Sequence, residues 1–178
     1  MYVRSLPALA LFLIALVAAS AWLSSGSHAE DKAAGDAALA RTRKQVQMLD
    51  DLYKTAIVLV TENYVDEASD LAAGSAFQKL FEAMRKKGYH DVRLLDATGD
   101  PYNEKNQPRD DFEKAAIAAL KAGKPTYEQV VTQDGKQFLK LATPIPVVMK
   151  KCTLCHPAYE KVVSGQPIGA LGYTIAIE

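Results

Sequence analysis

The chain has 178 residues, of which 49% are hydrophobic and 24% charged, as in an ordinary globular protein rather than a disordered one. Its 21 Lys and Arg residues balance 21 Asp and Glu residues, so no net charge directs it to nucleic acid or to an acidic membrane surface. Both cysteines, Cys152 and Cys155, lie in one short stretch.

The N-terminal segment has the pattern of an export signal. Arg4 precedes an almost unbroken apolar run over residues 6–23, and a stretch of small residues follows, in which Ser27-x-Ala29 fits a cleavage site. The apolar run is also just long enough to span a bilayer. We therefore interpret residues 1–29 as a signal peptide or a membrane anchor. Either interpretation places residues 30–178, a single domain, in the periplasm or otherwise outside the cytoplasm.

Two helices are predicted first. Residues 31–65 form one long helix, because apolar residues recur at alternating three- and four-residue spacing and draw one stripe: Val46, Leu49, Tyr53, Ala56, Val60 and Tyr64. Residues 75–87 form a second helix that ends at Gly88, with four apolar side chains directed inward: Phe77, Leu80, Phe81 and Met84. The stripe on the first helix suits core packing or a helix-pair seam, which also allows a homodimer.

Strands and a third helix follow. Residues 91–96 predict a strand, and residues 98–108, rich in Gly, Pro, Asn and Asp, a loop. Asp110 and Glu113 resemble a capping box that opens a helix through residue 121. Residues 127–131 and 137–143 flank Asp134-Gly135, a strong signal for a β-hairpin because both turn residues tolerate positive φ.

The last part of the chain is read in the same way. Pro144 and Pro146 are expected to break the second hairpin strand, and residues 152–163 to form a short helix or turn. Apolar residues alternate with small ones over residues 171–177, which predicts a final half-buried strand. The order of elements indicates an α+β fold with a small antiparallel sheet, a long N-terminal helix and flanking helices. No hairpin is expected in the all-helical fold of small electron-carrying c cytochromes.

The residues Cys152-Thr153-Leu154-Cys155-His156 form the attachment signature of c-type haem. Two thiols three residues apart on a helical turn can each reach one vinyl group at the edge of the macrocycle. His156 can then place its imidazole under the iron as the proximal axial ligand. Covalent attachment retains the cofactor in an exported protein, so the motif and the N-terminal signal support each other. The motif predicts one covalent haem c.

Three other interpretations of the motif fit less well. A Cys152–Cys155 disulfide would close too small a loop to stabilise the fold much. A thioredoxin-like redox pair is expected after a strand at a helix start, whereas Pro144 and Pro146 interrupt the approach here. A closed zinc site needs four ligands, and beyond the motif the chain offers only His90 and His28.

The sixth position on the iron stays open. His90 is the candidate that we single out, because it is the only other histidine inside the predicted domain. The other candidates are three methionines, water, a vacant site and two tyrosines: Met48, Met84 and Met149, with Tyr64 and Tyr102. Lys150, Lys151 and Arg93 are candidates to pair with the haem propionates, or they simply face solvent.

This order of elements resembles the PAS-like c-type haem domain family. Its members are extracytoplasmic sensor domains of bacterial chemoreceptors and kinases, or stand-alone exported monohaem proteins. The resemblance covers roughly residues 45–178. After the leading helix, the segments of this chain that match the family follow in order: Val92–Leu94, Asn106–Glu113, Ala142–Ile145, the haem motif and Ile168–Ala170. Some members use an additional cysteine near the leading helix as second axial ligand; this chain has no third cysteine, and Val60 or a neighbour stands there.

The resemblance implies a redox or small-gas sensing module that signals through a partner protein. The alternative is a periplasmic electron-transfer cytochrome that docks on a redox partner. An enzymatic role such as peroxidase ranks third, because no distal acid–base pair can be assigned and no catalytic residue is singled out. Nothing in the sequence indicates binding to nucleic acid.

Overall fold

The computed structural model describes the backbone of residues 9–64, 73–155, 157–163 and 165–178, and the side chains of residues 31–64, 73–153, 159–163 and 165–178. The chain forms two units, Met1–Ala40 and Arg41–Glu178. Helix α1 spans Leu9–Tyr64, so the helix predicted over residues 31–65 is confirmed as far as the description extends. The signal peptide or anchor predicted over residues 1–29 lies where no side chain is described. Among the described residues, no helix is both long and apolar enough to cross a membrane.

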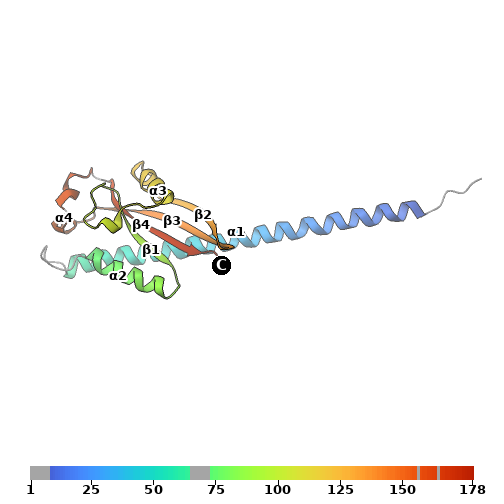
Figure 1. Ribbon diagram of the computed structural model, residues 1–178, viewed down its shortest axis with the longest axis horizontal. Helices are drawn as coiled ribbons and strands as arrows, with labels where there is room; N and C mark the ends of the chain where they lie inside the picture. Colours follow the sequence, from blue (N-terminus) through green and yellow to red (C-terminus); the bar gives the residue numbers. More distant parts are fainter. Residues whose placement is uncertain (1–8, 65–72, 156, 164) are drawn as a thin grey trace, which may run out of the picture. The chain divides into compact units, whose positions relative to one another are not determined.

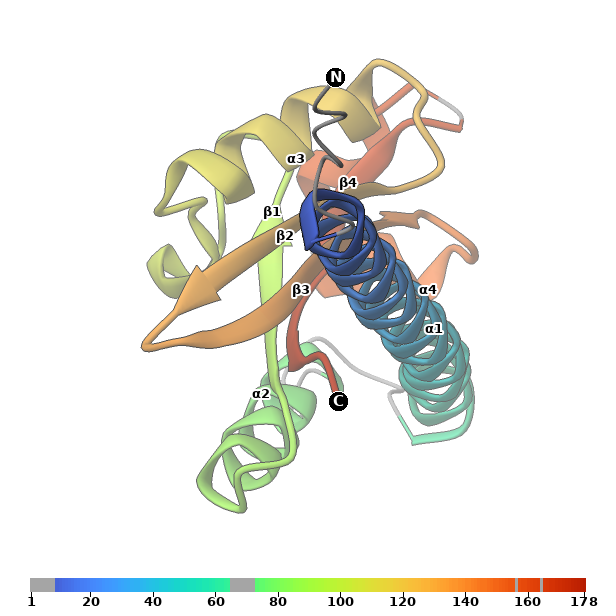
Figure 2. The same ribbon diagram turned by 90° about the vertical axis from the view of Figure 1, so that its right-hand side faces the viewer.

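The unit Arg41–Glu178 is built on an antiparallel sheet of four strands, in the order β1-β4-β3-β2. The strands are β1 (Asp91–Asp96), β2 (Tyr127–Gln133), β3 (Lys136–Pro146) and β4 (Pro167–Ala176). Helices α1 and α2 (Ala73–Lys86) lie against one face, and α3 (Asp111–Lys121) covers the other (Figures 1 and 2). The predicted α+β fold, with a small antiparallel sheet, a long N-terminal helix and flanking helices, is confirmed.

Local sequence signals set several of these boundaries. The Asp110 side chain accepts a hydrogen bond from the Glu113 N–H at 2.8 Å and caps α3. Glu113 returns the bond one residue earlier than a standard capping box, to the Arg109 N–H at 2.7 Å. Asp134 and Gly135 both have positive φ, of 50° and 74°, which is the two-residue turn that joins antiparallel strands without splaying them.

The prediction that Pro144 and Pro146 break the second hairpin strand is wrong, because β3 continues to Pro146. Tyr127, the first residue of β2, pairs with Ala142, so β3 has no neighbour on that side from residue 143 on. The Ile177 N–H donates to the Gln137 carbonyl at 2.9 Å, which directs the odd-numbered residues of β3 toward β4. Pro144 therefore faces the free side, where its missing N–H costs no sheet hydrogen bond.

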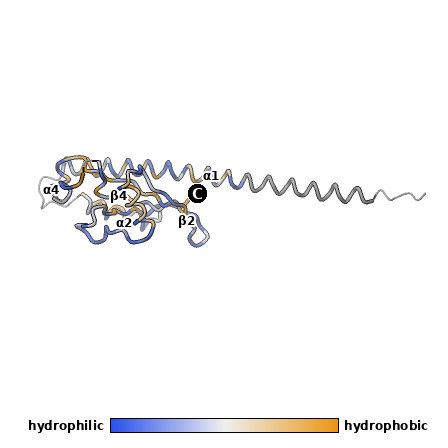
Figure 3. Tube along the Cα trace, turned by 90° about the horizontal axis from the view of Figure 1, so that it is seen from above, coloured by the Kyte–Doolittle hydropathy of each residue, from blue (hydrophilic) through white to orange (hydrophobic). Residues whose placement is uncertain are grey.

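Alternating side chains give the sheet two packed faces. On one face, α3 buries Phe112, Ala116 and Leu120 against the sheet, in a cluster completed by Leu95, Ala142 and Ala170. On the other face, Tyr173 and Leu139 are almost fully buried on the side of α1. Figure 3 shows the hydrophobic residues gathered in the middle of the unit, around β4.

The apolar stripes predicted on the first two helices are only partly buried. Val46 and Tyr53 are in the core, as are Phe77 and Phe81 of α2. The Tyr53 and Phe81 rings meet edge to face, with centroids 5.1 Å apart. Two predicted members are exposed instead, Tyr64 at 78% and Leu80 at 39%. Tyr64 is the last residue of α1, and Leu80 lies beside the Phe77/Phe81 pair on the flank of a narrow buried face.

Candidate functional site

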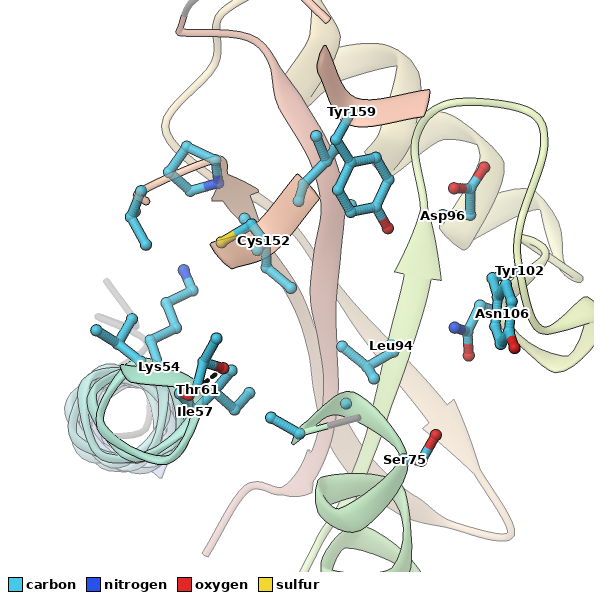
Figure 4. Close-up of a pocket in the computed structure, with 18 of the residues that line it drawn as sticks. Lys54, Ile57, Thr61, Ser75, Leu94, Asp96, Tyr102, Asn106, Cys152 and Tyr159 are labelled. Carbon is cyan, nitrogen blue, oxygen red and sulfur yellow. Dashed lines mark hydrogen bonds between the residues drawn. The ribbon is translucent and has the colours of Figure 1, made fainter. Parts of the chain in front are cut away.

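A cavity of about 250 Å³ opens in the unit Arg41–Glu178 (Figure 4). Its walls come from the C-terminal part of α1, the start of α2, the end of β1 with the loop after it, and the end of β3. The start of β4, the short helix α4 (Lys151–Cys155) and the 3-10 turn Pro157–Lys161 complete it. The cavity therefore joins segments that are far apart in the sequence.

Cys152 brings the haem-attachment motif to this cavity. Its side chain lines the wall and is a free, half-buried thiol. The Cys152 N–H donates to the Met149 carbonyl at 3.1 Å, and the Thr153 N–H to the Lys150 carbonyl at 3.0 Å, so the motif lies on a helical turn, as predicted. Helical geometry puts positions 152 and 155 on one face of that turn.

The other two motif residues are less fully described. The backbone of Cys155 ends α4, but its side chain lies outside the described residues, and all of His156 does. The predicted roles of Cys155 as second thioether residue and of His156 as axial ligand therefore stay predictions. Among the described side chains, no three His, Cys, Asp or Glu residues converge on one point.

One part of the cavity wall is apolar. Ile57 of α1 and Leu94 of β1 line this part (Figure 4), together with Val58 of α1, Ile145 of β3 and Ile168 of β4. Ile57 directly follows Ala56 of the predicted stripe, and Val58 lies two residues before Val60, so neither belongs to the stripe itself. Such a lining favours a hydrophobic ligand over a highly polar one.

A second part of the wall is a cluster of side-chain amides. Gln78 of α2 donates from Nε2 to Asn106 Oδ1 at 2.6 Å, and Asn103 donates from Nδ2 to Gln78 Oε1 at 3.2 Å. All three residues line the cavity. Arg93 supports the loop that carries the two asparagines, because its Nη2 donates to the Lys105 carbonyl at 2.7 Å. We call Gln78, Asn103 and Asn106 the amide cluster.

Tyr159 adds a phenol to the cavity. Burial, with a smaller contribution from Asp96, raises the pKa of Tyr159 to about 12. Like other tyrosine hydroxyls at physiological pH, this one can both donate and accept hydrogen bonds. Asp96 also lines the cavity, and its carboxylate accepts hydrogen bonds from the Thr98 hydroxyl at 2.8 Å and the Gly99 N–H at 2.6 Å.

The structure does not bring His90 to the cavity. Its Nε2 lies 2.8 Å from the Tyr53 hydroxyl, and the residue is not part of the cavity wall. Burial lowers the pKa of His90, while the charge of Asp91 acts in the opposite direction. As described, His90 is a hydrogen-bonded residue between α1 and β1, away from Cys152.

The other candidates for the sixth position divide between the wall and the surface. Met149 and Tyr102 line the cavity, whereas Met84 and Tyr64 do not. Met48 is 63% exposed on α1 and is also absent from the wall. Met149 lies three residues before Cys152 in the sequence, and this proximity is what places it in the same wall.

The basic residues considered as propionate partners have other contacts. Lys151 Nζ donates to the Glu62 carbonyl at 2.8 Å, in the last turn of α1. Arg93 forms an ion pair with Glu113. Lys150 is exposed. A lysine that sequence reasoning did not consider, Lys54, lines the cavity and pairs with Asp50 at 2.9 Å.

Sequence reasoning also missed the amide cluster and Tyr159. The Asn-rich loop was recognised as a loop, but Gln78 reaches it from α2, 25 residues before Asn103 and 28 before Asn106. No local pattern connects residues that far apart. Tyr159 offered one signal, since it lies four residues after Cys155 in a short helical segment.

Among known protein families, a family model described as Tll0287-like matches residues 30–171. This range contains the long helix from residue 30 on, the haem motif and the first half of β4. No curated protein matches the chain.

Proposed function

The chain belongs to the Tll0287-like family, and from this membership we propose that it is an exported monohaem c-type protein with a PAS-like haem domain. In this proposal Cys152 and Cys155 carry the haem covalently, and His156 is an axial ligand of the iron. Membership suggests a haem-binding domain, and the motif names the attachment residues. The haem, when bound, supplies a one-electron redox centre and an iron that can bind small gases.

The residues around Cys152 fit such a cofactor. The thiol faces a cavity with an apolar wall from Ile57, Val58 and Leu94, which suits the macrocycle, and with a polar amide cluster opposite. Tyr159 contributes a neutral hydroxyl within the same wall. The observation that carries the proposal is this convergence of Cys152 with apolar side chains from α1, β1 and β3.

We assign the module to redox or small-gas sensing. Of the α1 residues that line the cavity, Ile57 and Val58 cannot ligate iron, and the amine of Lys54 is held by Asp50. His90 is bound to Tyr53. A change in oxidation state or ligand at the iron would be transmitted to α1, which also contacts the attachment helix α4 through Lys151. The signal would pass to a partner protein outside the cytoplasm, where the predicted export segment delivers the domain.

One observation favours the alternative, a periplasmic electron-transfer cytochrome. Val148 lines the cavity and is 57% exposed, and its neighbour Val147 is also exposed. An apolar rim of this kind is suited to a transient contact with a redox partner. The two functions differ at the sixth position of the iron: gas sensing needs it open to a ligand such as CO or NO, whereas simple electron transfer is favoured by a fixed sixth ligand.

The first experiment tests haem attachment. The chain is produced together with the c-type maturation machinery, and covalent haem is measured after denaturation by its pyridine haemochrome spectrum. We expect covalent haem in the wild type, loss of one thioether link in Cys152→Ala and in Cys155→Ala, and full attachment in the control Thr153→Ala. A wild type without covalent haem contradicts the proposal.

The second experiment separates the two functions. Optical and resonance Raman spectra of the ferric and ferrous holoprotein are recorded with and without CO or NO. Rapid CO binding to a five-coordinate ferrous haem supports gas sensing and contradicts a simple electron carrier. An inert, six-coordinate low-spin haem in both oxidation states contradicts gas sensing and favours electron transfer.

A further inference from the structure

The amide cluster offers hydrogen-bond donors to the cavity. Each side-chain amide has one oxygen and two N–H groups. The oxygens of Gln78, Asn103 and Asn106 each accept a hydrogen bond, from Asn103, the Lys105 N–H and Gln78 respectively. Asn103 and Gln78 each donate only one N–H within the cluster, and Asn106 Nδ2 donates to none of the described residues. The cluster therefore has more N–H donors than its own oxygens use. Spare donors suit a carboxylate, which only accepts hydrogen bonds.

The cluster lies across the cavity from the attachment residue. In Figure 4, Cys152 is on one side, on α4, and Asn106 is on the other, in the loop after β1. In haem, the two vinyl groups that form thioether bonds and the two propionates are on opposite edges of the macrocycle. A haem attached through Cys152 consequently directs its carboxylates away from α4, toward the side where the amides lie.

The nearby cations have other partners. Lys54 Nζ contacts Asp50 Oδ2 at 2.9 Å and Thr143 Oγ1 at 3.0 Å. Lys151 Nζ contacts the Glu62 carbonyl at 2.8 Å. Arg93 is held by Glu113 and by the carbonyl of Lys105. Among the described residues of the wall, Asp96 is the one carboxylate, and it accepts hydrogen bonds from its own loop.

Resting on the haem attachment proposed above, we infer that the amide cluster of Gln78, Asn103 and Asn106 is the binding site for the haem propionates. The site is neutral: it holds the carboxylates by amide N–H donors rather than by an ion pair. Hydrogen bonds to the charged form of an acid favour that form. The N–H dipoles of the cluster offset part of the negative charge of the ionised propionates. Since that charge stabilises ferric iron, the cluster raises the reduction potential of the haem.

The test uses holoprotein whose haem is made from δ-aminolaevulinate labelled with heavy carbon at its carboxyl group, so that only the propionate carboxylates carry the label. Redox-difference infrared spectra then identify the propionate bands. In Asn106→Asp, Oδ1 still accepts from Gln78 while the donor Nδ2 is replaced by an oxygen. We expect the labelled bands to shift and the reduction potential to fall. Gln78→Leu, which removes the amide altogether, is expected to shift the same bands.

The matched control is Asn63→Asp, since Asn63 is exposed on α1 and donates to the Leu59 carbonyl at 2.9 Å. It adds the same charge outside the cavity and should leave the labelled bands in place. If the wild type carries covalent haem but neither cavity variant moves the labelled bands, the inference is wrong while the proposed function stands. A wild type without covalent haem overturns the proposed function itself. Binding of free acetate by the Cys152→Ala/Cys155→Ala protein at the cluster, with unmoved propionate bands in the holoprotein, assigns the site to a soluble carboxylate and also overturns the inference.

Discussion

At several buried positions of this domain, the close contacts of a residue explain which amino acid is found there. Gly169 of β4 pairs with Asp96 and lies in the cavity wall, and a Cβ at this position would come within 2.6 Å of the Leu95 carbonyl oxygen. Only glycine lets β4 approach β1 so closely. Tyr53 and His90 similarly hold each other through one hydrogen bond. At each of these positions, the neighbouring atoms determine which side chain is accommodated.

His90 gives the domain a pH-dependent stability. Burial lowers its pKa below the ordinary value of 6.5, so the unfolded chain binds a proton more readily than the folded one. The contribution of neutral His90 to the free energy of unfolding is therefore fully present above about pH 6.5. It is lost as the pH falls through the lowered pKa of His90 in the folded state. We expect the free energy of unfolding of the wild type, measured with urea, to fall between about pH 7.5 and 5.5, and to fall less in His90→Gln.

Because His90 is not in the cavity wall, the ferric and ferrous spectra of His90→Gln holoprotein should equal those of the wild type. A changed Soret band in that variant would instead identify His90 as the sixth ligand. An unaltered pH dependence would show that other groups control stability in this range.

At the scale of elements, one polar network holds helix α1 on the sheet. Asp50 Oδ1 accepts hydrogen bonds from the Thr143 hydroxyl of β3 at 2.5 Å and from the Tyr173 hydroxyl of β4 at 3.0 Å. Asp50 Oδ2 accepts from Lys54. Burial and the charge of Asp50 raise the pKa of Tyr173. A single carboxylate thus connects the helix with the two central strands.

Removing that carboxylate should loosen α1. Asp50→Ala leaves two hydroxyls and an ammonium without their acceptor in a site where the Asp50 side chain is only 14% exposed. We expect a loss of about 2–3 kcal/mol in the free energy of unfolding, measured by urea denaturation. The neighbouring Asp51 is exposed, so Asp51→Ala should stay within about 0.5 kcal/mol of the wild type. Equal effects of the two variants would mean that the network does not anchor the helix.

At the scale of the whole molecule, the division at residue 40 separates two units. The unit Arg41–Glu178 contains the sheet, both packed faces and the whole cavity wall. It also contains the first contacts of α1 with the rest of that unit, such as the ion pair between Arg43 and Glu128 at 2.6 Å. We therefore expect residues 41–178 to fold on their own.

A truncated chain tests this expectation. Residues 41–178, expressed alone, should unfold cooperatively in urea with the midpoint of the full-length protein, since every core residue that the structure describes lies within them. Residues 55–178 should fail to do so, because they lack Val46, Asp50 and Tyr53. Circular dichroism at increasing urea concentration measures both. Cooperative unfolding of the shorter fragment would contradict the assignment of α1 to the core.

Much of the fold followed from local patterns. β1 has the predicted bounds, and α3 and the β2–β3 hairpin appear where capping and turn residues indicated them. Pro144 was misread because a proline's effect depends on whether a strand lies on its N–H side, and β2 ends before that point. Leu80 and Tyr64 were misread because periodicity locates a helix face but not how wide a strip of it is covered.

The haem-attachment motif, from Cys152 to His156, and the likeness to a haem family come from the sequence alone, because thioether attachment depends on residues that are neighbours in the chain. The tertiary structure decided what surrounds Cys152: an apolar wall to which α1 contributes, an amide cluster formed by α2 and a distant loop, and the hydroxyl of Tyr159. It also placed His90 against Tyr53 instead of in the cavity. Which side chains meet across a cavity depends on how helices and strands pack, and no spacing within one segment specifies that.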